Sequence, residues 1–136
     1  MRTIEHIHDF IEAFVRWAST QADIHAVGMV GSYARSAARD DSDIDLVILS
    51  ELPQRYLGDT AWIERFGQVG KYQIEDYGKL TSLRVWYLDG TEVEYGITTL
   101  DWVALPLDEG TQQVISDGIL VLFERSPLLS PHIKKQ

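Results

Sequence analysis

The stretch GSYARSAARDDSDIDLVILS, residues 31–50, carries the features that decide the fold. After a Gly-Ser turn, an alanine-rich segment without a helix breaker predicts a short helix over 33–39. The polar Asp-Asp-Ser ends that helix, and the apolar run DIDLVIL predicts a buried strand over 43–49. Successive side chains of a strand point to opposite faces, so Asp43 and Asp45 share one face. The sequence therefore predicts two neighbouring carboxylates close to a short helix that follows a Gly-Ser turn.

The segments on either side of this stretch predict a sheet and packing helices. The apolar periodicity and the turn signals indicate, in chain order, a helix over 4–18, a strand over 23–31, a helix over 59–67 with Asp59 as its N-cap, a hairpin over 83–98, a helix over 108–117 and a strand over 119–124. The predicted class is α+β, a mixed sheet with helices packed on one face.

The hairpin turns at Asp89-Gly90, and its second strand alternates cleanly. Glu92 and Glu94 lie on one face of this strand, while Val93 and its apolar neighbours form the other face. The strand can therefore place a carboxylate beside the Asp43 and Asp45 pair while its apolar side enters the core. We expect Glu92 to lie at the surface.

The composition is that of an ordinary folded domain. The chain has 136 residues, of which 45% are hydrophobic and 24% charged. This length suits one domain, predicted over 1–125, followed by a C-terminal tail over 126–136. No repeat or low-complexity segment interrupts it.

The charge balance narrows the choice of partners and compartment. Twelve Lys and Arg residues against twenty-one Asp and Glu residues give a formal net charge of −9, which repels the phosphates of nucleic acids and of acidic membranes. The N-terminal MRTIEHIHDFIEAFVRW has charges scattered among its apolar residues, so it predicts neither a secretory signal nor a membrane span. The absence of cysteine suits a reducing compartment. We expect a cytoplasmic protein that binds neither nucleic acid nor membrane.

The chemistry of residues 31–50 points to a metal and a phosphate. Backbone N–H groups at a helix N-terminus behind Gly31 can bind an anion, and the Ser32 hydroxyl adds a donor. Two ionised aspartates on one strand face raise each other's pKa, and a divalent cation removes that conflict. Mg²⁺ prefers carboxylates together with water and phosphate oxygens. The sequence therefore predicts a single site in residues 31–50 that binds both a phosphate and a metal ion.

These residues resemble the DNA polymerase β-like nucleotidyltransferase superfamily. Its pattern is Gly-Ser, a spacer of about ten residues, Asp-x-Asp, and a third carboxylate on a later strand. GSYARSAARDDSDIDL fits the form GSxARG…SDxDL, with Ser36 where glycine is usual. The order AWIERFG, VWYLDGTEVEYGI, VISDGILVLFE is also similar to the N-terminal catalytic domain of aminoglycoside 6-adenylyltransferases, in which the acidic residue four after the hairpin glycine is the third carboxylate. That residue is Glu94.

The resemblance implies transfer of a nucleoside monophosphate, AMP from ATP being the first choice, to a hydroxyl acceptor with release of pyrophosphate. It implies that the three carboxylates hold two Mg²⁺ ions and carry the catalysis, and that the nucleotide phosphates bind at the Gly-Ser turn with help from nearby arginines. The implied catalytic and metal residues are Asp43, Asp45 and Glu94, and the implied nucleotide-binding residues are Gly31, Ser32, Arg35 and Arg39.

The acceptor and the assembly stay open at this point. The sequence has no counterpart of the large helical domain with which aminoglycoside 6-adenylyltransferases hold their antibiotic, and it also resembles the minimal nucleotidyltransferases, which act on or with a partner protein. The alternatives are an active enzyme, whose acceptor is a small molecule or a protein, and an antitoxin-like or binding module. A homodimer or a separate partner chain would close the open side of so small a domain.

Overall fold

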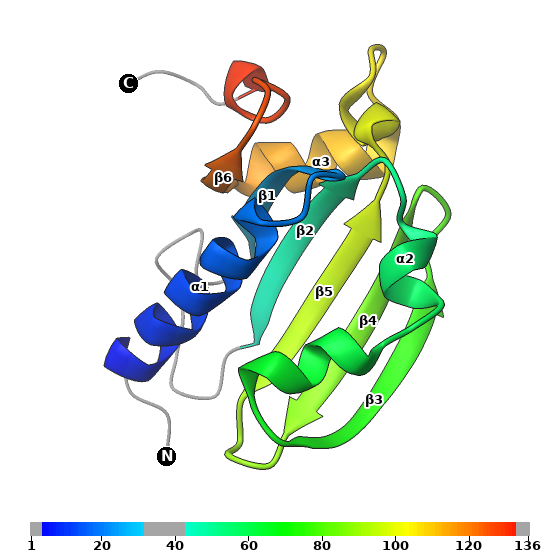
Figure 1. Ribbon diagram of the computed structural model, residues 1–136. Coiled ribbons are helices and arrows are strands. Elements are labelled where there is room, and N and C mark those ends of the chain that lie inside the picture. Colours follow the sequence, from blue (N-terminus) through cyan, green and yellow to red (C-terminus); the bar gives the residue numbers. More distant parts are fainter. Residues whose placement is uncertain (1–3, 32–42, 133–136) are drawn as a thin grey trace.

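The central feature of the fold is a mixed sheet. The computed structural model describes residues 4–31 and 43–132, and within them six strands pair in the order β3-β4-β5-β2-β1-β6 (Figure 1). The elements are α1 Ile4–Ser19, β1 Ile24–Val30, β2 Ile44–Ser50, α2 Gln54–Leu57, η1 Ala61–Phe66, β3 Val69–Asp76, β4 Leu80–Tyr87, β5 Glu92–Thr98, η2 Leu100–Val103, α3 Glu109–Asp117, β6 Leu120–Glu124 and η3 Ser130–His132, where η marks a 3₁₀ helix. The predicted helix over 33–39 lies outside the described residues.

The pairing of the strands is antiparallel with one exception. β2 and β5 run parallel in the middle of the sheet, and all other described pairs are antiparallel. A parallel pair needs a long crossover connection, which α2, η1, β3 and β4 supply between β2 and β5. The prediction of a mixed sheet in an α+β domain is therefore confirmed.

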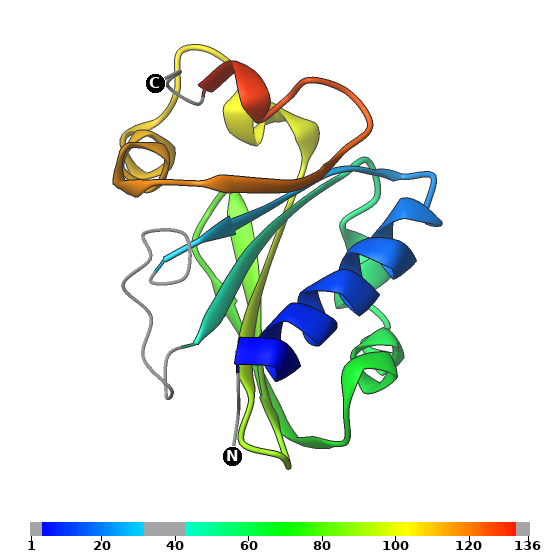
Figure 2. The ribbon, with the colours of Figure 1, turned by 90° about the vertical axis from the view of Figure 1, so that its left-hand side faces the viewer.

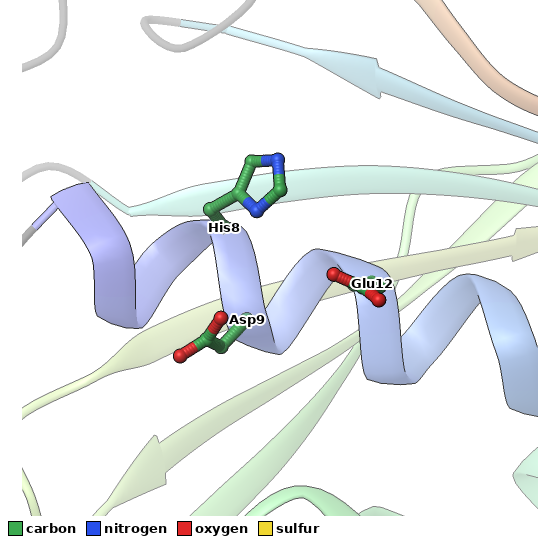
Figure 3. Close-up of side chains that lie close together, drawn as sticks. All are labelled: His8, Asp9 and Glu12. Carbon is green, nitrogen blue, oxygen red and sulfur yellow. The ribbon is translucent and has the colours of Figure 1, made fainter.

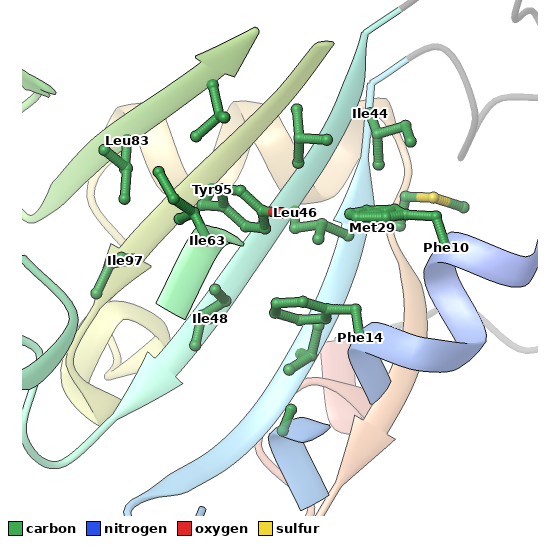
Figure 4. Close-up of a cluster of buried hydrophobic side chains, with 14 of the residues drawn as sticks. Phe10, Phe14, Met29, Ile44, Leu46, Ile48, Ile63, Leu83, Tyr95 and Ile97 are labelled. Carbon is green, nitrogen blue, oxygen red and sulfur yellow. The ribbon is translucent and has the colours of Figure 1, made fainter. Parts of the chain in front are cut away.

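Helix α1 covers one face of the sheet. Its buried side chains Ile7, Phe10, Phe14 and Ala18 recur at helical spacing and form a single apolar stripe. Figure 4 shows Phe10 and Phe14 pointing from the helix onto the sheet, where they join the main buried cluster. The helix ends one residue beyond the predicted range of 4–18.

The two faces of β2 lead to two separate cores. Ile44, Leu46 and Ile48 face α1, α2 and η1, whereas Val47 and Leu49 face the opposite side. On that opposite side they pack with η2 and α3, and Figure 2 shows α1 and α3 on opposite sides of the sheet. The expectation that helices pack on one face thus holds for α1, α2 and η1, while α3 and η2 cover part of the other face. They do so because the strands present a second apolar surface there.

Two further segments differ in detail from the predictions. The segment predicted as a helix over 59–67 forms the 3₁₀ helix η1, and Asp59 accepts a hydrogen bond from the amide of Ala61 at 3.0 Å. Only six residues separate Thr60 from Gly67, which is short for a stable α-helix. After β6, Leu129 is buried in the second core cluster. The division of the chain at residue 125 stays a prediction.

Within the part of the chain that the structure describes, no helix combines the length and the apolar character that a membrane crossing requires.

Candidate active site

Three carboxylates converge where β2 and β5 run side by side. Asp45 lies opposite Glu94 in the parallel register, and Asp43 precedes β2 by one residue. Side chains two residues apart on a strand share a face, which puts Asp43 beside Asp45. One ligand oxygen from each of the three residues lies within 4.8 Å of the others. The structure thus brings together the three carboxylates that the sequence analysis singled out.

One oxygen of the half-buried Asp45 carboxylate lacks a hydrogen-bond partner. Its Oδ1 is the one buried side-chain polar atom without a hydrogen bond among the described residues. Burial, and then the charge of Glu94, raise the pKa of Asp45 to about 7. Burial, and then the charge of Glu92, also raise the pKa of Asp43. An unsatisfied buried oxygen between like charges is costly, and a hard divalent cation would satisfy it. The three residues therefore fit a divalent metal ion.

Two side chains of β4, the strand next to β5, hold the Glu94 carboxylate by hydrogen bonds. The Ser82 hydroxyl donates to Glu94 Oε1 at 2.9 Å, and Arg84 Nη2 donates to Glu94 Oε2 at 3.0 Å. Neither residue was predicted. The alternation of β4 was the available signal, because Ser82 and Arg84 flank the buried Leu83 and so face the carboxylate side.

Gly31 lies at the end of β1 against the site. Val30 pairs with Asp45, and Gly31 follows with φ of 76°, a conformation that other residues adopt only with strain. A Cβ at this position would overlap the Asp45 carboxylate. Glycine is therefore required both by the backbone and by Asp45. The other predicted nucleotide-binding residues, Ser32, Arg35 and Arg39, lie outside the described residues.

Gly31→Ala is expected to destabilise the protein more than Gly78→Ala does. Both glycines have positive φ, but a Cβ at Gly78 meets nothing within 4 Å. Each substitution carries the left-handed penalty of about 1–2 kcal/mol, and only Gly31→Ala adds the collision with Asp45. Thermal unfolding of both variants measures the difference. Equal losses of Tm would mean that Asp45 moves aside without cost.

A cavity of about 630 Å³ adjoins the carboxylates. The lining includes Val47, Leu80 and Gly96 of the sheet and residues of α3. It also includes Trp102 of η2 and Lys79 in the connection between β3 and β4. Asp45 and Glu94 also line it. A mainly apolar hollow beside clustered carboxylates has the form of a substrate site.

A second group of possible metal ligands lies on α1. His8, Asp9 and Glu12 have ligand atoms within 4.8 Å of one another, but all three residues are exposed (Figure 3). Glu12 also accepts a hydrogen bond from Arg16 at 3.0 Å. Groups of this kind are common on solvated helix faces. We assign no site to it.

The fold and the converging carboxylates define a nucleotidyltransferase domain, in agreement with a family model. The family model described as streptomycin adenylyltransferase matches residues 1–115, and the chain belongs to that family. Among curated proteins, no sequence matches the chain.

Solved structures support the same fold. An aminoglycoside 6-adenyltransferase from Bacillus subtilis superposes with a TM-score of 0.59 at 15% sequence identity, covering 88% of this chain and 41% of its own. Cid1 in complex with the UTP analogue UMPNPP superposes with a TM-score of 0.53 at 8% identity, covering 83% of this chain and 32% of its own. The chain thus spans less than half the length of these proteins.

Proposed function

We propose that the chain is a metal-dependent nucleotidyltransferase that moves a nucleoside monophosphate, AMP from ATP in the first instance, to a hydroxyl acceptor in the cytoplasm. The observation that carries the proposal is the convergence of Asp43, Asp45 and Glu94 beside Gly31 and a cavity, in a member of an adenylyltransferase family. The orphaned Oδ1 of Asp45 adds support for the metal.

Each site residue receives a role in this proposal. Two Mg²⁺ ions held by the carboxylates would supply positive charge to the attacking and leaving oxygens. Asp43 and Asp45 would hold both ions, and Glu94 would complete the ligand set and take the acceptor proton. The acceptor oxygen forms a bond to the α-phosphorus, and the bond from that phosphorus to the pyrophosphate oxygen breaks.

The nucleotide phosphates are assigned to the turn after β1. Gly31 and Ser32 would bind the β- and γ-phosphates through backbone N–H groups and the hydroxyl, and Arg35 or Arg39 would add positive charge. The net charge of −9 supports a small molecule or a protein as acceptor in preference to a nucleic acid. A homodimer or a partner chain would cover the open side of the site.

Labelled ATP tests the proposal directly. The purified protein, Mg²⁺ and a lysate of its source are incubated with ATP labelled at the α-phosphorus, and in parallel with ATP labelled at the γ-phosphorus. We expect a labelled acceptor with the α-label alone, and none with Asp45→Asn. Labelling from the γ-position would indicate phosphoryl transfer. Nucleotide binding without any labelled acceptor would instead support a binding module.

A further inference from the structure

Arg84 places a positive charge among the carboxylates of the site. It lies on β4, opposite Glu94 of β5, and its side chain is 25% exposed. Its guanidinium bonds Glu92 at 2.6 Å, Glu94 at 3.0 Å and Asp43 at 3.2 Å, and its Nε lies 3.7 Å from Glu75. Burial lowers the pKa of Arg84, but the bond to Glu92 and the charges of Glu94 and Asp43 raise it overall, so it stays charged.

The partners of Arg84 fall into two groups. Asp43 and Glu94 are also members of the candidate metal cluster, whereas Glu92 and Glu75 are not. The positive guanidinium partly offsets the negative charge of the carboxylates bonded to it, which weakens their attraction for a metal. The guanidinium also repels a divalent cation that binds beside it. Arg84 and the metal therefore compete for Asp43 and Glu94. Asp45 has no hydrogen bond to Arg84 and keeps its free Oδ1.

Glu92 and Glu75 give Arg84 two partners that lie outside the candidate metal cluster. The bond from Arg84 to Glu92 is the shortest of the three hydrogen bonds, and Glu75 forms an ion pair with the same guanidinium from β3. If Asp43 and Glu94 turn to a metal, Arg84 keeps these two partners and is not left as a buried unpaired charge. Glu92, expected at the surface from the sequence, is instead part of the site: its side chain is 24% exposed.

We propose that Arg84 is a positioning residue that acts as an exchangeable counter-ion. It orients Asp43 and Glu94 while the metal is absent, and it is held by Glu92 and Glu75 when those carboxylates bind the metal. It thereby weakens metal binding and aligns Glu94 together with Ser82. The proposal rests on the metal dependence of the proposed function.

The test is the binding of Mn²⁺ to the full chain in the absence of nucleotide, measured by calorimetry. Arg84→Gln is expected to lower the Mn²⁺ dissociation constant roughly tenfold or more, because a like charge is removed. Lys71→Gln is the matched control: it removes a cation that stacks on Trp86, and no bond between Lys71 and a site carboxylate is found among the described residues. Unchanged or weaker Mn²⁺ binding in Arg84→Gln would overturn the proposal, since a merely structural arginine would act that way.

The part played by Glu92 is tested in a double-mutant cycle. Glu92→Gln should weaken Mn²⁺ binding roughly tenfold in the wild-type background, and by about threefold at most once Arg84→Gln is present. Equal factors in the two backgrounds would mean that Glu92 acts by its own charge and not through Arg84, which would refute the exchange.

A measurement on the unaltered protein covers the case that Arg84→Gln does not fold. The NMR signal of the Arg84 side chain, assigned by its loss in Arg84→Lys, should shift when Mg²⁺ is added, and a signal that does not move would overturn the proposal.

The Arg84→Lys variant keeps the positive charge but loses the planar guanidinium that can bond two carboxylates at once. It should bind Mn²⁺ with an affinity close to wild type and transfer roughly tenfold more slowly, with KM unchanged.

The two proposals fail separately. Mn²⁺ binding that depends on Asp45 and tightens in Arg84→Gln, without any labelled acceptor, would sustain the counter-ion role and refute the transferase. Loss of metal binding in every form, the wild type included, would refute both.

Discussion

Asp45→Asn is expected to lower nucleotidyl transfer by roughly a thousandfold or more, since it removes the proposed shared metal ligand. The same variant should lose the joint stabilisation by Mg²⁺ and ATP, which in the wild type exceeds the effect of either ligand alone because both bind the native state. Asp43→Asn should also lose the joint stabilisation. Thermal unfolding with each ligand, and with both, measures this loss.

Without metal, Asp45→Asn should be the more stable protein at high pH. The pKa of Asp45 in the folded chain is raised from 3.8 to about 7, so between these values the folded state binds more protons than the unfolded state. Stability therefore falls as the pH rises through this window, and the loss is complete above it. The neutral asparagine carries no such loss. We expect equal Tm values near pH 4, and a gain of several degrees for the variant at about pH 8.

Asp117→Asn is the control for this result. It removes one carboxylate from the exposed end of α3, and the Tm difference from wild type should not grow with pH as that of Asp45→Asn does.

The outcome that would contradict the role of Asp45 as a metal ligand is full stabilisation of Asp45→Asn by Mg²⁺ together with ATP.

The sequence predicts the middle of the site well, because strong local signals define it. The apolar run after Asp43 places β2, and the alternation of Glu92 to Ile97 places β5 with its carboxylates on one face. Both strands are buried on the opposite face, so a shift of one residue would expose the core. The parallel pairing that brings Asp45 opposite Glu94 is long-range and was not predicted. The alternation indicated only that this strand can place a carboxylate beside the Asp43 and Asp45 pair, and the resemblance implied that Glu94 is that carboxylate.

Strand β3 could not be predicted from periodicity. Tyr72 and Ile74 on one face and Lys71, Gln73 and Glu75 on the other are nearly all exposed, since β3 forms an edge of the sheet beyond the helices. Without a buried face, no alternation of apolar and polar residues is required.

The contact between Arg84 and Glu94 depends on the length of the loop at the predicted Asp89-Gly90 turn. A two-residue Asp-Gly turn would place Val85 opposite Glu94. The structure instead has a three-residue loop, closed by the bond from the Tyr87 amide to the Thr91 carbonyl at 2.9 Å, with Gly90 at a φ of 94°. The register shifts by one residue, and Arg84 meets Glu94.

Glu94→Gln is expected to lower the transfer rate on the order of a hundredfold or more, through loss of the proposed metal ligand and of the proposed base for the acceptor proton. Glutamine keeps the shape: its carbonyl oxygen can accept from Arg84, and its amide can donate to the Ser82 hydroxyl oxygen, so the fold should be retained. Its neutral oxygen neither takes a proton nor matches a carboxylate toward a metal. Single-turnover rates at saturating Mg²⁺ measure the loss.

Glu92→Gln is the matched control for this prediction. Both glutamates lie on one face of β5 and both bond Arg84, but only Glu94 belongs to the cluster with Asp43 and Asp45. At saturating Mg²⁺ the Glu92→Gln rate should stay within about threefold of wild type, because its effect lies in metal affinity and not in the chemical step. Equal large losses in both variants would show that Glu94 has no special role, and a large loss confined to Glu92→Gln would transfer the role of third carboxylate to Glu92.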